Sequence, residues 1–280
     1  MNTLEIRNLT KSYPGFLLDN LSLTLPGGCI MGLIGENGAG KSTTIRLILD
    51  MIRPDSGSIR IFGEDHRTVY PLAKEEIGVV MDEVGIPASL NARQVGRVMA
   101  GIFRTWDQAM YDSYLKRLEL PEKKLFKEYS RGMKMKLGIA IAMSHHPKLL
   151  LLDEATSGLD PVVRDEVVQM LMDFTRDEAH TILISSHIVS DLEKLCDYIA
   201  FLHKGKLLLC EEKDKLLDEY CFVQGTGEEL RGLPAEAVLG IRENRYGAEA
   251  IVLREAVDGS WQTGPVTIEE LFLYMVKEGK

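Results

Sequence analysis

The stretch Gly35-Glu36-Asn37-Gly38-Ala39-Gly40-Lys41-Ser42 lies between a predicted strand and a predicted helix, and it fits the pattern G-x-x-x-x-G-K-[ST]. The glycines let successive backbone N–H groups curl around an anion, and the N-terminus of the following helix adds a favourable dipole. Lys41 can reach the β- and γ-phosphates of a nucleotide, and the Ser42 hydroxyl offers Mg²⁺ the hard oxygen that it prefers. The pattern therefore predicts a site for ATP or GTP, formed by Gly35, Asn37, Gly38, Ala39, Gly40, Lys41, Ser42 and Thr43.

The residues around this stretch alternate between strand and helix patterns. Cys29–Ile34 is a continuous apolar run that ends at a glycine, as in a strand buried on both faces. A helix is expected over Lys41–Ile52, because Pro54 cannot continue it. Alternating apolar and polar residues predict further strands around Leu4–Ile6, Leu21–Leu25 and Ile59–Ile61.

The spacing of apolar residues becomes helical from about Pro87 to His146. Asp107–Leu120 and Met133–Met143 carry apolar residues three and four positions apart. This part of the chain is therefore expected to be a helical subdomain, about residues 87–146, inserted between strands.

Strand patterns return after the helical segment. They occur at Leu149–Leu152, Thr181–Ser185 and Tyr198–Leu202, with a helix predicted over Val162–Thr175 that begins at Asp160-Pro161. Strands that alternate with helices indicate an α/β sheet.

The pattern weakens after about Lys213. Gly225–Gly227 and Gly232–Pro234 are expected to be loops, and Ala250–Leu253 a strand. Thr267 and Glu270 form a capping-box pattern at the start of a final helix, Leu271–Lys277. Residues 214–280 are predicted to be a small α+β extension with no chemistry of its own.

Two carboxylates follow the apolar strand Leu149–Leu152. Because ligands of open α/β sheets bind at the carboxyl ends of the strands, Asp153 is placed to hold hydrated Mg²⁺ and Glu154 to act as general base on the attacking water. Taken alone, an acidic pair after a strand is more often a helix cap; together with the phosphate-binding loop it favours catalysis.

His187 follows the predicted strand Thr181–Ser185. A lone histidine at a strand end is usually a surface or core residue. Here a neutral imidazole could contact the γ-phosphate and fix the water, so His187 is a candidate catalytic residue beside Glu154 and Lys41.

Composition argues against three classes of function: nucleic-acid binding, zinc binding and direct insertion into a membrane. The net charge of 33 − 42 = −9 argues against a nucleic-acid partner, whose phosphates would favour a basic face. The four cysteines show neither a CxxC spacing nor a nearby histidine pair, so no zinc site is expected. No apolar run approaches the roughly 18–20 residues that cross a bilayer, so any membrane role is expected to come through a partner.

Taken together, these residues resemble an ATP-binding-cassette (ABC) ATPase over roughly residues 1–212. Tyr13 is similar to the aromatic residue that stacks on adenine, although a strand aromatic in the core is the simpler alternative. Ser130-Arg131-Gly132-Met133 is similar to the family signature, Ser157-Gly158-Leu159-Asp160 to the loop that contacts the partner subunit, and His187 to the switch histidine. The family's elements occur in order and at family-like separations.

The resemblance implies an α/β fold with a P-loop NTPase core, an antiparallel β subdomain and the inserted α-helical subdomain. These make up a nucleotide-binding domain over residues 1–213, followed by a small C-terminal accessory domain over 214–280. It also implies a head-to-tail dimer with a second ATPase subunit, identical or different. Each ATP would then be bound in trans by Ser130, Gly132 and Asp160 of the other subunit; the alternative for Ser130 is a plain helix cap.

This sequence departs from the family pattern at three positions. The signature usually has a second glycine where Arg131 stands and a glutamine where Met133 stands. The loop that enters the helical subdomain usually carries a glutamine that ligates Mg²⁺ and water, and Asp82 stands there instead. An unpaired carboxylate would repel the γ-phosphate, so Asp82 is a metal-ligand candidate that puts turnover in doubt.

The leading hypothesis is a peripheral ATPase at the cytoplasmic face of the membrane, bound there by a separately encoded transmembrane permease. The helical subdomain and residues 82–90 would form the docking groove. The variant residues and the ending Glu269–Tyr274 resemble bacterial exporter ATPases for antibiotics, peptides or lipids. The alternatives are a soluble ABC ATPase acting on ribosomes or DNA, and a module that senses nucleotide without turnover.

Overall fold

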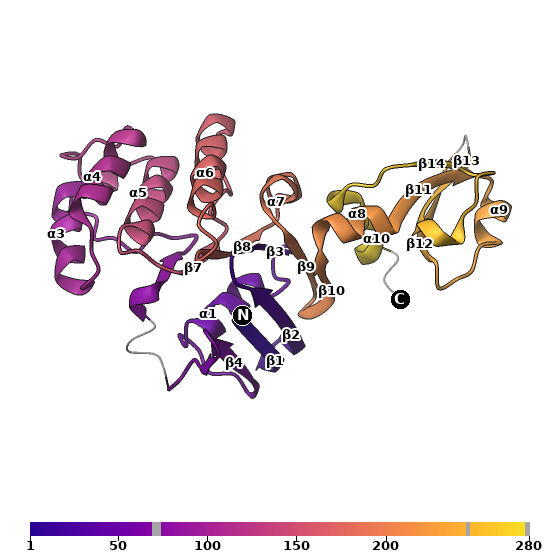
Figure 1. The fold of residues 1–280 in the computed structure, drawn as a ribbon, viewed down its shortest axis with the longest axis horizontal. Coiled ribbons are helices and arrows are strands. Elements are labelled where there is room, and N and C mark those ends of the chain that lie inside the picture. The colour runs from indigo at the N-terminus through magenta and orange to yellow at the C-terminus, as the bar shows by residue number, and fades with distance from the viewer. Residues whose placement is uncertain (69–73, 245–246, 278–280) are drawn as a thin grey trace.

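Three β-sheets organise the residues that the computed structural model describes, which are 1–68, 74–244 and 247–277 (Figure 1). The first sheet is antiparallel and lies at the N-terminus. Its strands, in spatial order, are β2 (Phe16–Pro26), β1 (Asn2–Tyr13), β4 (Ser56–Ile61) and β5 (Glu64–Asp65). Alternate residues of β1 and β2, such as Leu4, Ile6 and Leu25, are buried, so one face of this sheet packs into a core.

The second sheet is the centre of the fold and is parallel except for one edge strand. Its strands, in spatial order, are β10 (Lys206–Glu212), β9 (Tyr198–His203), β3 (Ile30–Ile34), β8 (Thr181–Ser186), β7 (Leu149–Asp153) and β6 (Ile77–Val80). β10 pairs antiparallel with β9, and the short 3₁₀ helix η1 (Lys74–Glu76) precedes β6.

Both faces of the central sheet are covered, which explains its continuous apolar strands. Leu149 and Leu151 of β7 pack into the core that contains the N-terminal sheet, whereas Leu150 and Leu152 pack into the core on the opposite face. The helix α1 (Lys41–Ile48) lies on the first face, and α6 (Pro161–Phe174) and α7 (Val189–Leu195) lie on the second (Figure 1).

The helical insert follows β6 and returns to the sheet at β7. It consists of α3 (Ala92–Ile102), α4 (Gln108–Arg117), the 3₁₀ helix η2 (Phe126–Glu128) and α5 (Arg131–Met143). Its helices begin at side-chain caps: Asn91, Asp107 and Ser130 each accept a hydrogen bond from a backbone N–H of the first turn.

The third sheet lies in the C-terminal region, at the far end of the molecule from the helical insert (Figure 1). Its strands, in spatial order, are β12 (Val238–Asn244), β13 (Gly247–Leu253), β11 (Tyr220–Gly225) and β14 (Gln262–Gly264). The helices of this region are α8 (Lys213–Glu219), α9 (Gly227–Arg231), η3 (Arg254–Ala256) and α10 (Ile268–Lys277).

Helix α10 packs against the central part of the fold. The ring centroid of Phe272 lies 5.3 Å from that of Phe201 in β9. Leu271 and Phe272 belong to the same buried cluster as Phe201 and Leu195, so the C-terminal region shares a core with the central sheet and its helices.

The structure confirms the predicted α/β fold with an inserted helical subdomain and corrects several boundaries. The first helix ends at Ile48, not Ile52, because Asp50 adopts a left-handed conformation (φ 51°) and the Met51 N–H donates back to the Arg46 carbonyl at 3.0 Å. Residues 225–227 are not a loop. Thr226 caps α9 through a reciprocal hydrogen-bond pair with Glu229.

Candidate functional site

The carboxyl ends of three neighbouring parallel strands meet at one edge of the central sheet. The register pairs Ile34 of β3 with Ser186 of β8, and Ser185 of β8 with Asp153 of β7. Because ligands of open α/β sheets bind beyond this edge, the predicted residues that follow these strands come together there.

Glycines shape the loop that follows β3. A Cβ atom on Gly35 would lie 2.4 Å from the Leu202 carbonyl oxygen, so only glycine allows the loop to pass β9 so closely. Gly38 and Gly40 adopt positive φ angles of 82° and 113°, and Gly40 is the N-cap of α1. The loop therefore curves tightly into the start of the helix, as the sequence predicted.

A pocket of about 510 Å³ opens beyond this edge. Its lining includes Asn37, Gly38, Gly40, Lys41, Ser42, Thr43, Asp82 and Glu154, which the sequence predicted as site residues. Gly35 and Ala39 belong to the same loop, but both are buried. The structure thus brings the phosphate-binding loop, the residue after β6 and the residue after β7 to one cavity.

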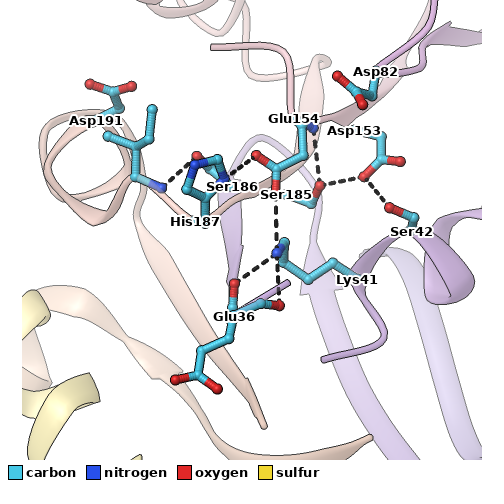
Figure 2. Close-up of polar contacts among 12 residues, drawn as sticks. Glu36, Lys41, Ser42, Asp82, Asp153, Glu154, Ser185, Ser186, His187 and Asp191 are labelled. Atoms are coloured by element: carbon cyan, nitrogen blue, oxygen red, sulfur yellow. Dashed lines mark hydrogen bonds and ion pairs between the residues drawn. The ribbon is translucent and has the colours of Figure 1, made fainter. Parts of the chain in front are cut away.

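Lys41 is held by backbone and carboxylate oxygens. Its Nζ donates to the carbonyl oxygens of Gly35 at 2.7 Å and Glu36 at 3.3 Å, and lies 3.1 Å from Glu154 Oε1 (Figure 2). The side chain is buried, so its charge acts in a medium that screens it less than water does. A phosphate in the pocket would compete with these oxygen atoms for the N–H groups of Lys41 Nζ.

Asp153 is buried and accepts two hydroxyl hydrogen bonds on one oxygen. Ser42 Oγ donates to Asp153 Oδ1 at 3.0 Å and Ser185 Oγ donates to it at 2.6 Å (Figure 2). The Ser185 hydroxyl also accepts a hydrogen bond from the Glu154 N–H at 3.1 Å. Ser185 therefore fixes both carboxylate-bearing residues, a role that sequence reasoning missed.

Glu154 lies between a lysine and a histidine. Its Oε1 faces Lys41 Nζ, and its Oε2 lies 2.7 Å from His187 Nδ1. Its backbone has a φ of 54°, which is uncommon for a residue other than glycine and is characteristic of functional sites. The carboxylate points into the pocket, where it can accept a proton.

Comparison with known proteins agrees with this geometry. Residues 18–157 match the family model described as "ABC transporter". The chain is 39% identical over 208 residues to the bacitracin transport ATP-binding protein BcrA of Bacillus licheniformis, a match that covers 73% of this chain and 68% of that protein. The chain belongs to the ABC transporter family.

Two further similarities bear on this ABC ATPase. It is 31% identical over 289 residues to the ABC transporter ATP-binding protein YtrB of Bacillus subtilis, covering 96% of this chain and 97% of that one. A solved ATP-binding subunit of an ABC transporter has a TM-score of 0.68 at 27% identity and covers 76% of this chain and 91% of its own. The chain is thus an ATP-binding and ATP-hydrolysing subunit that powers a membrane transporter. None of the helices in the described ranges combines the length and apolarity needed to span a bilayer.

Tyr13 of the ABC ATPase lies at the end of β1, in the hairpin that precedes the pocket. It pairs with Phe16 across the hairpin, and 40% of its surface is exposed. Gly15 and Phe16 line the pocket, whereas Tyr13 is not among the lining residues. Its contact with adenine stays a prediction. Phe16 is a second aromatic candidate, which the sequence analysis did not identify.

The predicted trans-acting residues lie outside this pocket. Ser130 Oγ accepts the Met133 N–H at 3.2 Å and caps α5, and Asp160 Oδ1 accepts the Val163 N–H at 3.1 Å and caps α6. Gly132 faces Val163, since a Cβ atom on it would lie 3.4 Å from Val163 Cγ1. In the single chain these residues therefore act as helix caps and packing contacts, and their binding to a partner's ATP stays a prediction.

Asp82 and Arg131, two of the departures from the family pattern, contact each other in the ABC ATPase. Arg131 Nη2 donates to Asp82 Oδ1 at 2.8 Å. Both side chains are about half exposed. The carboxylate at the predicted metal-ligand position is therefore paired.

A second charged pair was missed from the sequence. Arg164 of α6 donates through Nη2 to the Leu159 carbonyl at 3.2 Å, and its Nε lies 3.7 Å from Asp191 Oδ2 of α7. This pair joins the loop before α6 to the helix that follows His187. Its residues stand far apart in the sequence, so only the fold shows the contact.

Proposed function

We propose that the chain hydrolyses ATP with Glu154 as general base and His187 as the residue that orients it, in a transporter that exports peptides, antibiotics or lipids. The observation that carries this proposal is the position of Glu154 over the phosphate-binding loop, between Lys41 at 3.1 Å and His187 at 2.7 Å. A carboxylate fixed on both sides can take a proton from water at the γ-phosphate.

Magnesium fits the oxygen atoms beside Glu154. Ser42 Oγ and Asp153 Oδ1 lie 3.0 Å apart, and both are hard ligands of the type that Mg²⁺ prefers. Ser42 and Asp153 would hold the ion, with Asp82 as a third candidate. Bound there, Mg²⁺ neutralises charge on the transferred phosphate. Lys41 and the loop N–H groups bind the β- and γ-phosphates, and Tyr13 stacks on the base.

Dimerisation around ATP completes the proposed site. Ser130 and Gly132 stand at the N-terminus of α5, where free N–H groups and the helix dipole favour an anion. Asp160 stands at the equivalent end of α6. Ser130 and Gly132 would bind the γ-phosphate of ATP held by a second ATPase subunit, identical or different, and Asp160 would contact that subunit beside its ATP.

A groove beside the site suits the membrane subunit. It has a volume of about 470 Å³ and is lined by Glu83 and Val84 after β6 and by Phe126, Lys134 and Met135 of the helical insert. Its apolar floor and charged rim would accept an amphipathic segment of a separately encoded permease. The chain would then lie at the cytoplasmic face of the membrane, with residues 214–280 as an accessory domain.

The relatives support the exporter assignment. BcrA is a bacitracin transport ATP-binding protein, and the chain is also 38% identical over 214 residues to the lantibiotic transport ATP-binding protein SrtF of Streptococcus pyogenes. The match to BcrA spans 208 residues, 73% of this chain. We therefore infer that the cargo of this transporter belongs to the same broad class.

The variant Glu154→Gln tests the general base. Glutamine keeps the shape and hydrogen bonds of the side chain but cannot accept the proton, so we expect turnover to fall by about 10²–10⁴-fold. ATP binding should persist and drive dimer formation, measured by size-exclusion chromatography with light scattering.

Glu76→Gln is the matched control. Glu76 also pairs with a lysine, with Lys148 Nζ at 2.7 Å, but it stands at the opposite end of β6 from the pocket. Turnover of this control should stay within about twofold of the parent chain, as is usual for surface changes. Parent-like hydrolysis by Glu154→Gln would refute the assignment.

A further inference from the structure

The residues that line the nucleotide pocket carry more acidic than basic side chains. Among the described residues, Glu36, Asp82 and Glu154 line it with Lys41 as the only lysine or arginine. A further carboxylate, that of Asp153, lies next to the pocket, where it accepts a hydrogen bond from the pocket residue Ser42. A polyanion entering this pocket therefore meets several negative charges, and each unpaired carboxylate weakens its binding.

Asp82 differs from Glu154 because its cationic contact comes from outside the residues that line the pocket. Lys41 and His187 contact Glu154, and His203 Nδ1 lies 3.6 Å from Glu36 Oε2. Asp82 instead pairs with Arg131, whose side chain comes from the neighbouring groove. Asp82 lines both cavities, so it stands at the boundary between the nucleotide pocket and that groove.

Arg131 is held in place by a second contact. A Cβ atom on Gly158 would lie 2.8 Å from Arg131 Nη1 and 3.0 Å from its Cζ, so the guanidinium packs on the backbone of that glycine. The side chain thus joins three loops: the one after β6, the one before α5 and the one before α6. The pair itself is about half exposed, and such pairs open at little cost.

We propose that Arg131 is a positioning residue for Asp82. It neutralises this carboxylate while a nucleotide enters the pocket, and it releases the carboxylate when Asp82 turns toward a divalent cation on the phosphates. The proposal rests on the proposed function, because it needs ATP in the pocket lined by Lys41.

A double-mutant cycle measures this coupling. Four chains are compared: the parent, Arg131→Gln, Asp82→Asn and the double variant, each titrated with a fluorescent ATP analogue in EDTA. We expect Arg131→Gln to weaken binding by about two- to fivefold, the range for an exposed ion pair. In the Asp82→Asn background the same change should have no effect, because no carboxylate remains to be neutralised.

Magnesium provides a second readout that does not depend on turnover. With Mg²⁺ present, the Asp82 carboxylate gains a cation, so Arg131→Gln should bind the analogue within about twofold of the parent. Arg131→Lys, which keeps the charge, should restore most of the affinity in EDTA. Urea unfolding of each variant verifies that the chains are folded.

Arg93→Gln is the matched control. Arg93 is an exposed arginine of the same helical insert and pairs with Glu122, away from the pocket. Its removal changes the net charge equally and should leave affinity unchanged. A similar loss in Arg93→Gln would indicate a long-range charge effect and refute the specific pair.

Two other outcomes overturn the proposal. Equal weakening by Arg131→Gln with and without Asp82 would mean that Arg131 acts directly on the nucleotide. No weakening in either background would mean that Asp82 needs no partner. Failure of the parent chain to bind the analogue in both EDTA and Mg²⁺ would instead refute the proposed function.

Discussion

Ser185→Ala is the sharpest test of how the carboxylates of Asp153 and Glu154 are positioned. The Ser185 hydroxyl is fully buried at the end of β8. It donates to Asp153 Oδ1 at 2.6 Å and accepts the Glu154 N–H at 3.1 Å. Alanine removes both hydrogen bonds and adds no atom that could clash.

The expected magnitude follows from these contacts. A hydrogen bond to a charged group contributes about 1.5–3 kcal/mol, and Asp153 keeps its second donor, Ser42. The Glu154 N–H also keeps the Ser185 carbonyl oxygen as an acceptor at 3.1 Å. We therefore expect a loss of unfolding free energy of about 1.5–2.5 kcal/mol. Because Asp153 is the proposed metal ligand, Mg²⁺ affinity should fall by about 10–100-fold.

Two assays separate these effects. Urea denaturation gives the change in unfolding free energy, and a Mg²⁺ titration of ATP-analogue binding gives the change in metal affinity. The control is Ser144→Ala, another fully buried hydroxyl, which donates to the neutral Ala140 carbonyl oxygen at 2.6 Å. It should cost about 1 kcal/mol and leave the Mg²⁺ dependence unchanged. Equal Mg²⁺ dependence in Ser185→Ala and the parent chain would refute the positioning role.

Two further predictions concern stability. Phe272→Ala should lower the unfolding free energy by about 3–5 kcal/mol, because the ring is nearly buried against Phe201. The control is Leu208→Ala, an exposed position where urea denaturation should show a loss below about 1 kcal/mol. A loss as small as this in Phe272→Ala would contradict the packing of α10. Burial lowers the pKa of His145, which stacks on Phe103 with ring centroids 4.0 Å apart. His145 therefore binds a proton more readily in the unfolded chain than in the folded one. The folded state loses stability as the pH falls through the pKa of an unfolded histidine, about 6.5. His145→Phe should lose less stability than the parent between about pH 7.5 and about pH 5.5, measured by urea denaturation, and an equal loss would contradict this origin.

Most of the fold could be predicted because its strong patterns are local. The strand Leu149–Asp153 shows its burial in consecutive leucines, and the loop at Gly35 carries its own glycines. The strand β6 was missed because it has only four residues and contains Gly78. That glycine is needed for packing, since a Cβ atom on it would lie 2.4 Å from Leu150 Cδ2. Such a contact depends on a residue far away in the sequence.

The C-terminal region was predicted less well. Its strands β11, β12 and β14 are short or carry mixed polar residues, so alternation alone did not reveal them. The capping box at Thr267 did predict the start of α10, because Glu270 Oε2 accepts the Thr267 N–H at 2.9 Å. Local hydrogen bonds were thus visible in the sequence, whereas strand pairing was not.

The same distinction applies to the site. Lys41, Asp82 and Glu154 were expected at one pocket, and they line it together. The sequence could not show that Ser185 joins Asp153 to Glu154, because a serine at a strand end has many ordinary roles. The pairing of Arg131 with Asp82 was equally hidden, since the residues lie 49 positions apart and only the fold brings them together.

The left-handed backbone of Glu154 has a consequence for how this chain can vary. A residue with a side chain costs about 1–2 kcal/mol in that conformation, and glycine avoids most of the strain. Substitution to glycine would relieve this strain, but it would also leave the buried Lys41 without its carboxylate partner. The backbone of this position therefore favours glycine, whereas the lysine beside it favours a carboxylate. A lineage that no longer needed turnover would be expected to change both residues together.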